Sequence, residues 1–373
     1  MKMQRRSLSA ALMLCSSLAA CQPDKGVGIN DGEDSKSLLI TEDLDILFVI
    51  DDSPSMADKQ ANLRANFPAF MAALESLPGG LPNVHIGVVT SDVGTKSTLD
   101  PDAGSQLGQL GMGGCAGTGK SGVLRTGTMI TGNFIRDIEQ PDGTRSVNYT
   151  GTLADAFSEI ASVGAGGCGF EQHLHAMKLA LDEHPDNAGF LRDDAMLAVV
   201  FLADEDDCSL SRAQAVADDP TLGPLQSFRC TRFGVTCDQG GETADDMNVT
   251  GPKGQCHPGS DTSYLDDVAD YVSFLQGLKA DPRLVVVGGI IGDAGSVAVE
   301  LLPPPSGGNP IPTLVHSCSY QGAFGLEVAD PAVRLQWLLD QFPGQSVSTS
   351  ICQADLTGGL GHVGQTIRRA LLK

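Results

Sequence analysis

The chain has 373 residues, of which 41% are hydrophobic and 19% charged, so it can bury a sizeable core and is not disordered throughout. Its 46 Asp and Glu residues outnumber its 24 Lys and Arg residues, and the formal net charge is −22. A phosphate backbone would be repelled by this charge, so we expect no nucleic-acid partner.

The first 20 residues have the pattern of an export signal, with three basic residues in positions 1–6 and a short apolar stretch after them. The stretch ends in Leu18-Ala19-Ala20-Cys21, which resembles the lipobox of bacterial lipoproteins. The resemblance implies cleavage before Cys21 and attachment of lipid to it; an ordinary signal peptide is the alternative. An Asp directly after Cys21 would favour retention in the inner membrane. This chain has Gln22 at that position, which favours the outer membrane.

These features predict a signal peptide over residues 1–20 and a flexible, polar tether over residues 21–42. We expect an exported protein in the cell envelope, held at the membrane only by its lipid anchor. The remaining residues, 43–373, are expected to form the folded domain.

From residue 43 onward, strand and helix patterns alternate. Continuous apolar runs predict buried strands at 45–50, 196–202 and 284–291. Further strands are expected at 85–90 and 347–351, with an edge strand near 123–130. Apolar residues at helical spacing predict helices at 63–77, 171–181, 265–278, 332–342 and 356–371. The alternation predicts an α/β fold with a doubly wound, mostly parallel central sheet, helices on both faces and the strand order 3-2-1-4-5-6. Residues at about 91–169 and 209–262 are expected to be disulfide-rich loop insertions.

Eight cysteines follow Cys21, and an even number in an exported chain predicts about four disulfides. A zinc site is disfavoured because the chain has no CxxC pair. Eight cysteines allow 105 pairings, so the connectivity stays open. The order of the segments suggests two pairs, Cys115–Cys168 and Cys318–Cys352.

Oxygen donors follow two of the predicted strands. Asp51, Ser53 and Ser55 form a DxSxS string directly after the first strand, and Asp204 follows the strand over 196–202. In the expected order these strands are neighbours, so both loops face one crevice at the carboxyl ends of the strands. Oxygen ligands suit Mg²⁺, with Ca²⁺ or Mn²⁺ as alternatives. The competing interpretation is that these side chains only cap the following helix.

Residues 46–56 and 199–204 resemble the von Willebrand factor type A domain and its metal-ion-dependent adhesion site. The resemblance extends to the order of strands and helices over residues 43–373, apart from the two insertions. It implies that Ser53 and Ser55 bind the metal directly and that Asp204 acts through water. It also implies that one coordination position stays open for an acidic group of a partner protein.

The third loop of the site departs from the family pattern, which has a Thr just before an Ala-Leu helix. When Ala176 and Met177 are aligned with that helix, Glu171 stands near the Thr position. A glutamate can bind a hard cation, so Glu171 either holds the metal more tightly or occupies the position of the external ligand. We favour the first interpretation.

Two further patterns are expected to carry no function. Residues 114–121 satisfy the P-loop pattern GxxxxGK[ST], but no buried strand precedes them and no convincing helix follows, so we expect no nucleotide. The acidic run at 205–207 is expected to be a solvated loop rather than a second cation site.

The leading hypothesis is an envelope-tethered binding or adhesion module that is not an enzyme. In it, a divalent cation engages a carboxylate of a protein partner and is held by Asp51, Ser53, Ser55, Glu171 and Asp204. One alternative is a disulfide-clamped scaffold whose cation only stabilises the fold. The other is an exported metal-dependent hydrolase with Glu171 or Glu205 as base, although the chain has no HExxH signature and no GxSxG in a strand–helix context.

Overall fold

The computed structural model describes residues 41, 43–100, 104–182, 184–304, 307–322 and 325–372. The predicted signal peptide, Cys21 and nearly all of the predicted tether lie outside these residues. All described residues belong to one unit, Leu38–Lys373. Among them, no helix combines the length and the apolar character that a membrane span needs.

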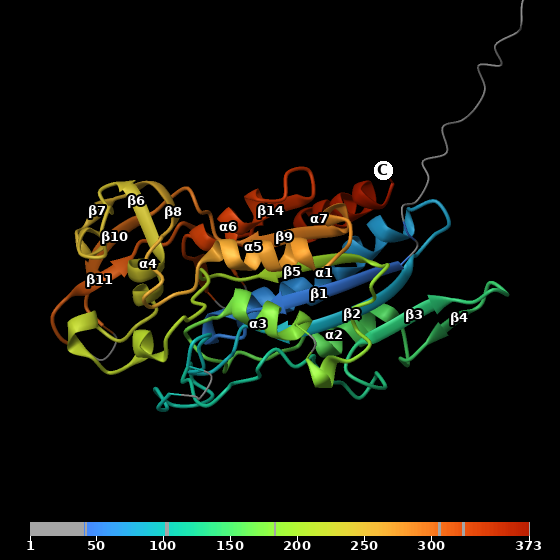
Figure 1. Cartoon of the computed structure of the whole chain (residues 1–373), viewed down its shortest axis with the longest axis horizontal. Coiled ribbons are helices and arrows are strands. Elements are labelled where there is room, and N and C mark those ends of the chain that lie inside the picture. Colours follow the sequence, from blue (N-terminus) through green and yellow to red (C-terminus); the bar gives the residue numbers. More distant parts are fainter. Residues whose placement is uncertain are drawn as a thin grey trace, which may run out of the picture. The chain divides into compact units, whose positions relative to one another are not determined.

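The centre of the domain is a seven-stranded sheet with the order β14-β9-β5-β1-β2-β3-β4 (Figure 1). Five adjacent strands are parallel: β1 (Asp43–Ile50), β2 (Asn83–Thr90), β5 (Met196–Leu202), β9 (Val285–Ile291) and β14 (Ser346–Ser350). β3 (Ile135–Glu139) pairs antiparallel with β2, and β4 (Arg145–Val147) pairs antiparallel with β3 at the edge of the sheet. The α/β class and the mostly parallel sheet agree with the sequence prediction, and β1 lies between β2 and β5 as expected.

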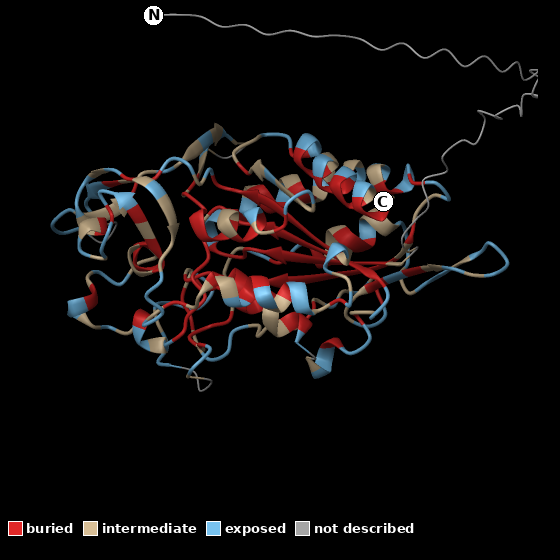
Figure 2. Cartoon of the chain, turned by 45° about the horizontal axis from the view of Figure 1, so that its top comes forward, coloured by how far each residue is buried: buried red, intermediate tan, exposed pale blue. Residues whose placement is uncertain are grey.

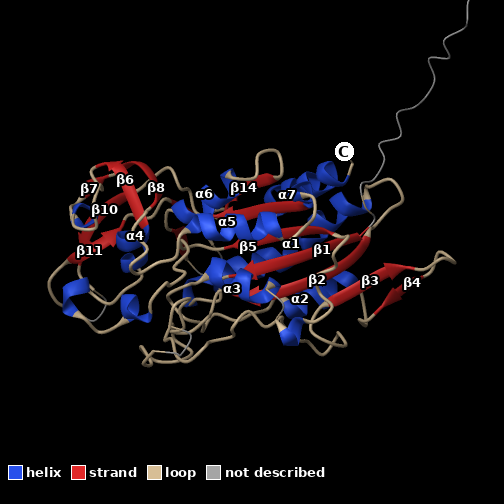
Figure 3. Cartoon of the chain, viewed as in Figure 1, coloured by secondary structure: helices blue, strands red, loops and turns tan. Residues whose placement is uncertain are grey.

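Helices cover both faces of the sheet (Figures 2 and 3). Alternate side chains of the strands point to opposite faces and belong to two different hydrophobic clusters. One cluster contains apolar residues of α1 (Ala57–Glu75), α2 (Leu153–Ile160) and α7 (Thr357–Leu371). The other contains apolar residues of α3 (His173–Leu181), α5 (Val268–Gly277) and α6 (Val333–Asp340). Both faces of β1, β5 and β9 are therefore buried, which is why these strands read as continuous apolar runs.

The prediction of an edge strand near residues 123–130 is wrong. Only the Arg125 N–H of this segment bonds to β2, at the Val88 carbonyl (2.8 Å), whereas the N–H groups of Thr128 and Met129 donate to the Glu159 carboxylate at 2.8 and 2.7 Å. The segment therefore has no strand ladder. The edge position next to β2 is taken by β3 instead.

The segment 91–169 supplies β3, β4 and α2, so part of this predicted insertion belongs to the sheet and its core. The segment 209–262 folds into α4 (Phe228–Gly234), β6 (Val235–Gln239), β7 (Gly251–Pro252) and β8 (Gly254–Pro258). Two hairpins that the sequence did not suggest follow β9: β10 (Ala298–Leu302) with β11 (Ile311–Leu314), and β12 (Cys318–Gln321) with β13 (Leu326–Ala329). β6, β7, β8, β10 and β11 gather at one end of the sheet (Figure 1).

Four disulfides cross-link the described chain: Cys115–Cys168, Cys208–Cys230, Cys237–Cys256 and Cys318–Cys352. The two pairs suggested by segment order are thereby confirmed. Disulfides persist in oxidising compartments, so four of them are typical of an extracellular or envelope protein.

Candidate functional site

The loop between β1 and the short 3₁₀ helix η1 (Pro54–Met56) carries the DxSxS residues. Asp51 is fully buried, and its Oδ1 accepts a hydrogen bond from the Ser53 backbone N–H at 2.7 Å. The hydroxyls of Ser53 and Ser55 lie 3.0 Å apart. Ser53 is the N-cap of η1 but makes no side-chain capping bond. Its hydroxyl is therefore turned to its neighbours in the loop and is not used as a helix cap.

The loop after β5 meets the DxSxS loop. Ile50 of β1 lies opposite Leu202 of β5, and the Asp51 N–H donates to the Leu202 carbonyl at 2.9 Å. Asp204 is only 3% exposed, and its Oδ1 accepts a hydrogen bond from Ser55 Oγ at 3.1 Å. The structure thus brings Asp51, Ser53, Ser55 and Asp204 together at the carboxyl ends of two adjacent strands.

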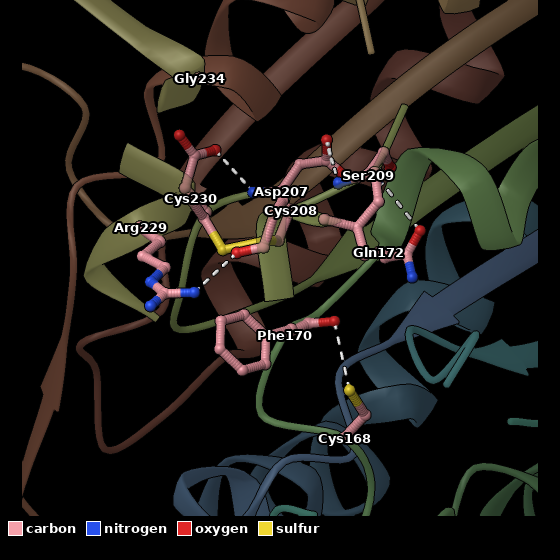
Figure 4. Close-up of a disulfide and its surroundings, with 12 residues drawn as sticks. Cys168, Phe170, Gln172, Asp207, Cys208, Ser209, Arg229, Cys230 and Gly234 are labelled. Atoms are coloured by element: carbon pink, nitrogen blue, oxygen red, sulfur yellow. Dashed lines mark hydrogen bonds between the residues drawn. A yellow bond between two sulfur atoms is a disulfide. The ribbon is translucent and has the colours of Figure 1, made fainter. Parts of the chain in front are cut away.

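Glu171 comes from a third segment, two residues before α3. Its side chain is 1% exposed and its Oε1 has no hydrogen-bond partner. Its backbone carbonyl accepts from the Cys208 N–H at 2.7 Å, so the segment is fixed to the loop that follows β5. The Cys208–Cys230 disulfide lies in the same region, with Asp207 and Ser209 beside it (Figure 4).

The carboxyl groups at this end of the sheet repel one another. Burial raises the pKa of Asp51 well above its ordinary value, and the Asp204 carboxylate raises it further. Burial also raises the pKa of Glu171, and Glu205 and Asp51 add to the effect. The pKa of Glu205 rises to about 8 because of burial and the nearby Asp330 and Asp204. A bound cation would relieve this repulsion.

Lys59, which the sequence analysis did not select, supplies a positive charge. Its Nζ lies 2.9 Å from Asp204 Oδ2 and 2.9 Å from Glu327 Oε2, and it donates to the Ser55 carbonyl at 3.1 Å. Burial alone would lower the pKa of Lys59, but the two carboxylates outweigh it and the pKa is raised. Lys59 stands one helical turn after Ser55, a spacing that could have indicated it. Glu327 lies on β13 and has no such local signal.

His173, the first residue of α3, is a second residue that sequence reasoning missed. It is fully buried, neither ring nitrogen has a hydrogen-bond partner, and its Nε2 lies 3.9 Å from Asp51 Oδ2. That oxygen also lacks a partner. Burial lowers the pKa of His173 to about 4, so the ring is neutral at pH 7. Its position two residues after Glu171 is the only sequence signal that could have indicated it.

Asp52 follows Asp51 in the loop but has a different partner. It is fully buried and forms an ion pair with Lys120, the lysine of the P-loop-like string. Its carbonyl accepts from the Gly167 N–H at 2.7 Å, and a Cβ on Gly167 would overlap the Asp52 carboxylate. Lys120 therefore anchors its loop to the sheet, and no helix follows within residues 122–131.

The prediction that residues 205–207 form a solvated loop is wrong for two of them, since Asp206 is 7% and Asp207 0% exposed. Asp206 accepts hydrogen bonds from the backbone N–H groups of Arg334 and Leu335 at the start of α6. Asp207 accepts from the Leu174 N–H at 2.9 Å and pairs with the buried Arg334 side chain at 3.1 Å. Both carboxylates satisfy helix N-termini, which explains their burial.

Whether the residues fit a divalent cation depends on their free donor atoms. Within the described ranges, no three His, Cys, Asp or Glu side chains are placed to hold a metal by themselves. Asp204 already bonds Ser55 and Lys59. However, Asp51 Oδ2 and Glu171 Oε1 are buried carboxylate oxygens without partners, and the hydroxyls of Ser53 and Ser55 belong to the same loop as Asp51. Unpartnered buried carboxylates are costly without a counter-charge, so this donor set fits a hard cation with serine ligands.

Comparisons with known proteins identify no family: no family model matches the chain, and no curated protein matches it. Among solved structures, the chain is similar to the pilus adhesin RrgA from Streptococcus pneumoniae, with 9% sequence identity and a TM-score of 0.24. The match covers 90% of this chain and 44% of the adhesin chain, so this chain spans less than half of that protein. A similarity of this size carries no argument about fold or function.

Proposed function

We propose that the chain is an exported binding or adhesion module of the von Willebrand factor A type, anchored in the outer membrane through lipid on Cys21. In this proposal a divalent cation is held by Asp51, Ser53, Ser55 and Glu171. Asp204 supports the site through its hydrogen bond with Ser55. When bound, the cation supplies an open coordination position for a carboxylate of the partner protein.

The observation that carries the proposal is the pair of buried, unpartnered carboxylate oxygens, Asp51 Oδ2 and Glu171 Oε1. Buried polar atoms normally have partners, and hydrogen bonds to other side chains do not satisfy these two. They lie at the carboxyl ends of parallel strands, which is where open α/β sheets bind ligands. A cation that binds both residues would satisfy both atoms.

Each residue of the proposed site has a different role. Asp51 fixes the loop, because its Oδ1 holds the Ser53 N–H and leaves Oδ2 for a ligand. Ser55 is exposed, so its hydroxyl marks the side from which a partner reaches the site. Lys59 neutralises part of the Asp204 charge. A chain with a net charge of −22 repels acidic partners, so local positive charge is needed to capture one.

Cation affinity of the full chain tests the first half of this proposal. Asp51→Asn keeps the shape of the side chain and removes its charge, and we expect it to weaken Mg²⁺ binding at least about tenfold in isothermal titration calorimetry. Asp52→Asn is the matched control, since that neighbouring carboxylate faces Lys120. Equal Mg²⁺ affinity in the Asp51→Asn variant and the parent would refute the site.

Partner capture tests the second half. An acidic protein captured from envelope extract should be released by EDTA and should not bind the Asp51→Asn variant. If Mg²⁺ raises the melting temperature while capture survives both treatments, the cation is structural and the scaffold hypothesis replaces the binding module.

A further inference from the structure

The two most exposed large hydrophobic side chains among the described residues both adjoin the DxSxS loop. They are Met112, which is 71% exposed, and Leu326, which is 65% exposed. The residue after Met112 approaches this loop closely, since a Cβ on Gly113 would lie 3.5 Å from Pro54 Cγ. Leu326 lines the same surface hollow as Ser55. Exposed apolar side chains that gather in one patch are typical of surfaces where another protein docks.

Both apolar side chains belong to segments that are held in place. The loop that carries Met112 is closed by two backbone hydrogen bonds of 2.8 Å between Leu107 and Cys115. Cys115 also forms a disulfide. β13, which begins at Leu326, pairs with β12, and the Cys318–Cys352 disulfide joins β12 to the segment after β14. A surface that is fixed before binding loses less conformational entropy when a partner docks.

The hollow beside Ser55 has a volume of about 480 Å³ and a lining of apolar and charged side chains. The apolar residues are Pro54, Ala57, Leu326 and Val328, and the charged ones are Asp58, Lys59 and Glu327. Among these described residues Lys59 carries the positive charge, and its Nζ is already paired with Glu327 and with the buried Asp204. Asp58 adds a further carboxylate. Carboxylates therefore outnumber ammonium groups here, and the hollow has a negative net charge.

We infer that the hollow binds a segment of a partner protein in which a Lys or Arg stands next to an aliphatic residue. The aliphatic side chain packs against Leu326 and Val328, and the cationic group approaches Asp58. The volume of about 480 Å³ lies within the range of about 300–1,000 Å³ that is usual for ligand pockets, so two side chains fit. Opposite charge favours a basic segment, and an acidic one would be repelled. The inference goes beyond the proposed function, because binding in the hollow needs no cation.

Short peptides test this inference on the ¹⁵N-labelled full chain, in EDTA so that no divalent cation takes part. The probes are three capped hexapeptides that differ only in their two central residues: Leu-Arg, Leu-Glu and Ser-Arg. We expect Leu-Arg to shift the amide resonances of Ser55, Ala57 and Val328 and to bind about tenfold more tightly than either other peptide, since each of those lacks one contact. No shift at millimolar Leu-Arg, or equal affinity for the three peptides, would overturn the inference.

Variants of the hollow give the second test, and they should fold like the parent because Leu326 is exposed and Asp58 is only half-buried. Leu326→Ser should weaken Leu-Arg binding about tenfold and leave Ser-Arg binding unchanged, and Asp58→Asn should reduce the preference for Leu-Arg over Leu-Glu. Leu302→Ser is the matched control, because this exposed leucine of β10 does not line the hollow, and it should change nothing. Leu-Arg binding that is unchanged in Leu326→Ser would overturn the inference. Asp51→Asn should bind the peptides like the parent, so this inference and the proposed cation site fail independently.

Discussion

Replacement of Lys59 by Met is the sharpest test of the electrostatic balance at the candidate site. Lys59 is 1% exposed and its Nζ lies 2.9 Å from carboxylate oxygens of both Asp204 and Glu327. At an effective dielectric constant of about 20, each contact at this distance is worth about 6 kcal/mol of Coulomb attraction. Dehydration of the ammonium and of the carboxylates costs several kcal/mol for each ion and offsets much of this attraction.

Removal of one member of a buried ion pair costs about 3–5 kcal/mol, because it leaves a buried charge without a partner. We therefore expect Lys59→Met to lower the free energy of unfolding by about 3–5 kcal/mol in the absence of metal, and the melting temperature by on the order of 10 °C. Mg²⁺ should recover part of this loss, because a cation at the site restores positive charge beside Asp204. Urea denaturation with intact disulfides measures the effect.

The control is Arg283→Met, which breaks a surface ion pair with Asp281 whose side chains are 65% and 34% exposed. Surface pairs contribute about 0–1 kcal/mol, so this variant should unfold almost like the parent. A loss in Lys59→Met no larger than in Arg283→Met would refute the conclusion that Lys59 balances buried charge.

Three further predictions concern stability. The pKa of Glu205 is raised from 4.5 to about 8 by burial and by Asp330, so the stabilising contribution of its protonated form is lost as the pH rises through 8. The metal-free protein should therefore gain stability as the pH is lowered from 8.5 to 6.5, and Glu205→Gln should flatten that profile in urea titrations. The Cys115–Cys168 disulfide closes a separation of 53 residues, so replacing both cysteines by Ser should lower the unfolding free energy by about 2–4 kcal/mol; an unchanged urea midpoint would contradict this. Asp206→Ala removes the acceptor for two N–H groups of α6 and should cost about 1–2 kcal/mol, and a thermal melt that matches the parent would show that water replaces the carboxylate.

Local sequence predicted the parts of the fold that depend on burial on both faces. β1, β5 and β9 read as continuous apolar runs because helices pack on each side of them. The edge strand failed because an edge is buried less and its sequence pattern is weaker. Within residues 123–130, the backbone N–H groups of Thr128 and Met129 bond to the Glu159 side chain, about 30 residues later, which no local pattern indicates.

In the candidate site too, local sequence indicated some residues, and tertiary contacts decided the placement of others. The DxSxS string is contiguous, and its position after a buried strand made Asp51, Ser53 and Ser55 visible in the chain. Asp206 and Asp207 looked like a solvated acidic run, yet they accept hydrogen bonds at the N-termini of α6 and α3. Burial of such residues depends on which helix ends meet them, and sequence order does not specify that.

The sequence by itself determined the α/β class, the export pattern and the oxygen donors that follow β1 and β5, because each follows from residues close together or from strand order. It suggested two of the disulfide pairs but left the connectivity open. Only the tertiary structure decided that Lys59 and Glu327 meet at Asp204, that His173 faces Asp51, and that Glu171 is buried without a partner at Oε1. These contacts join residues from separate helices, strands and loops. Their energies depend on burial and on the direction of each side chain, which packing alone sets.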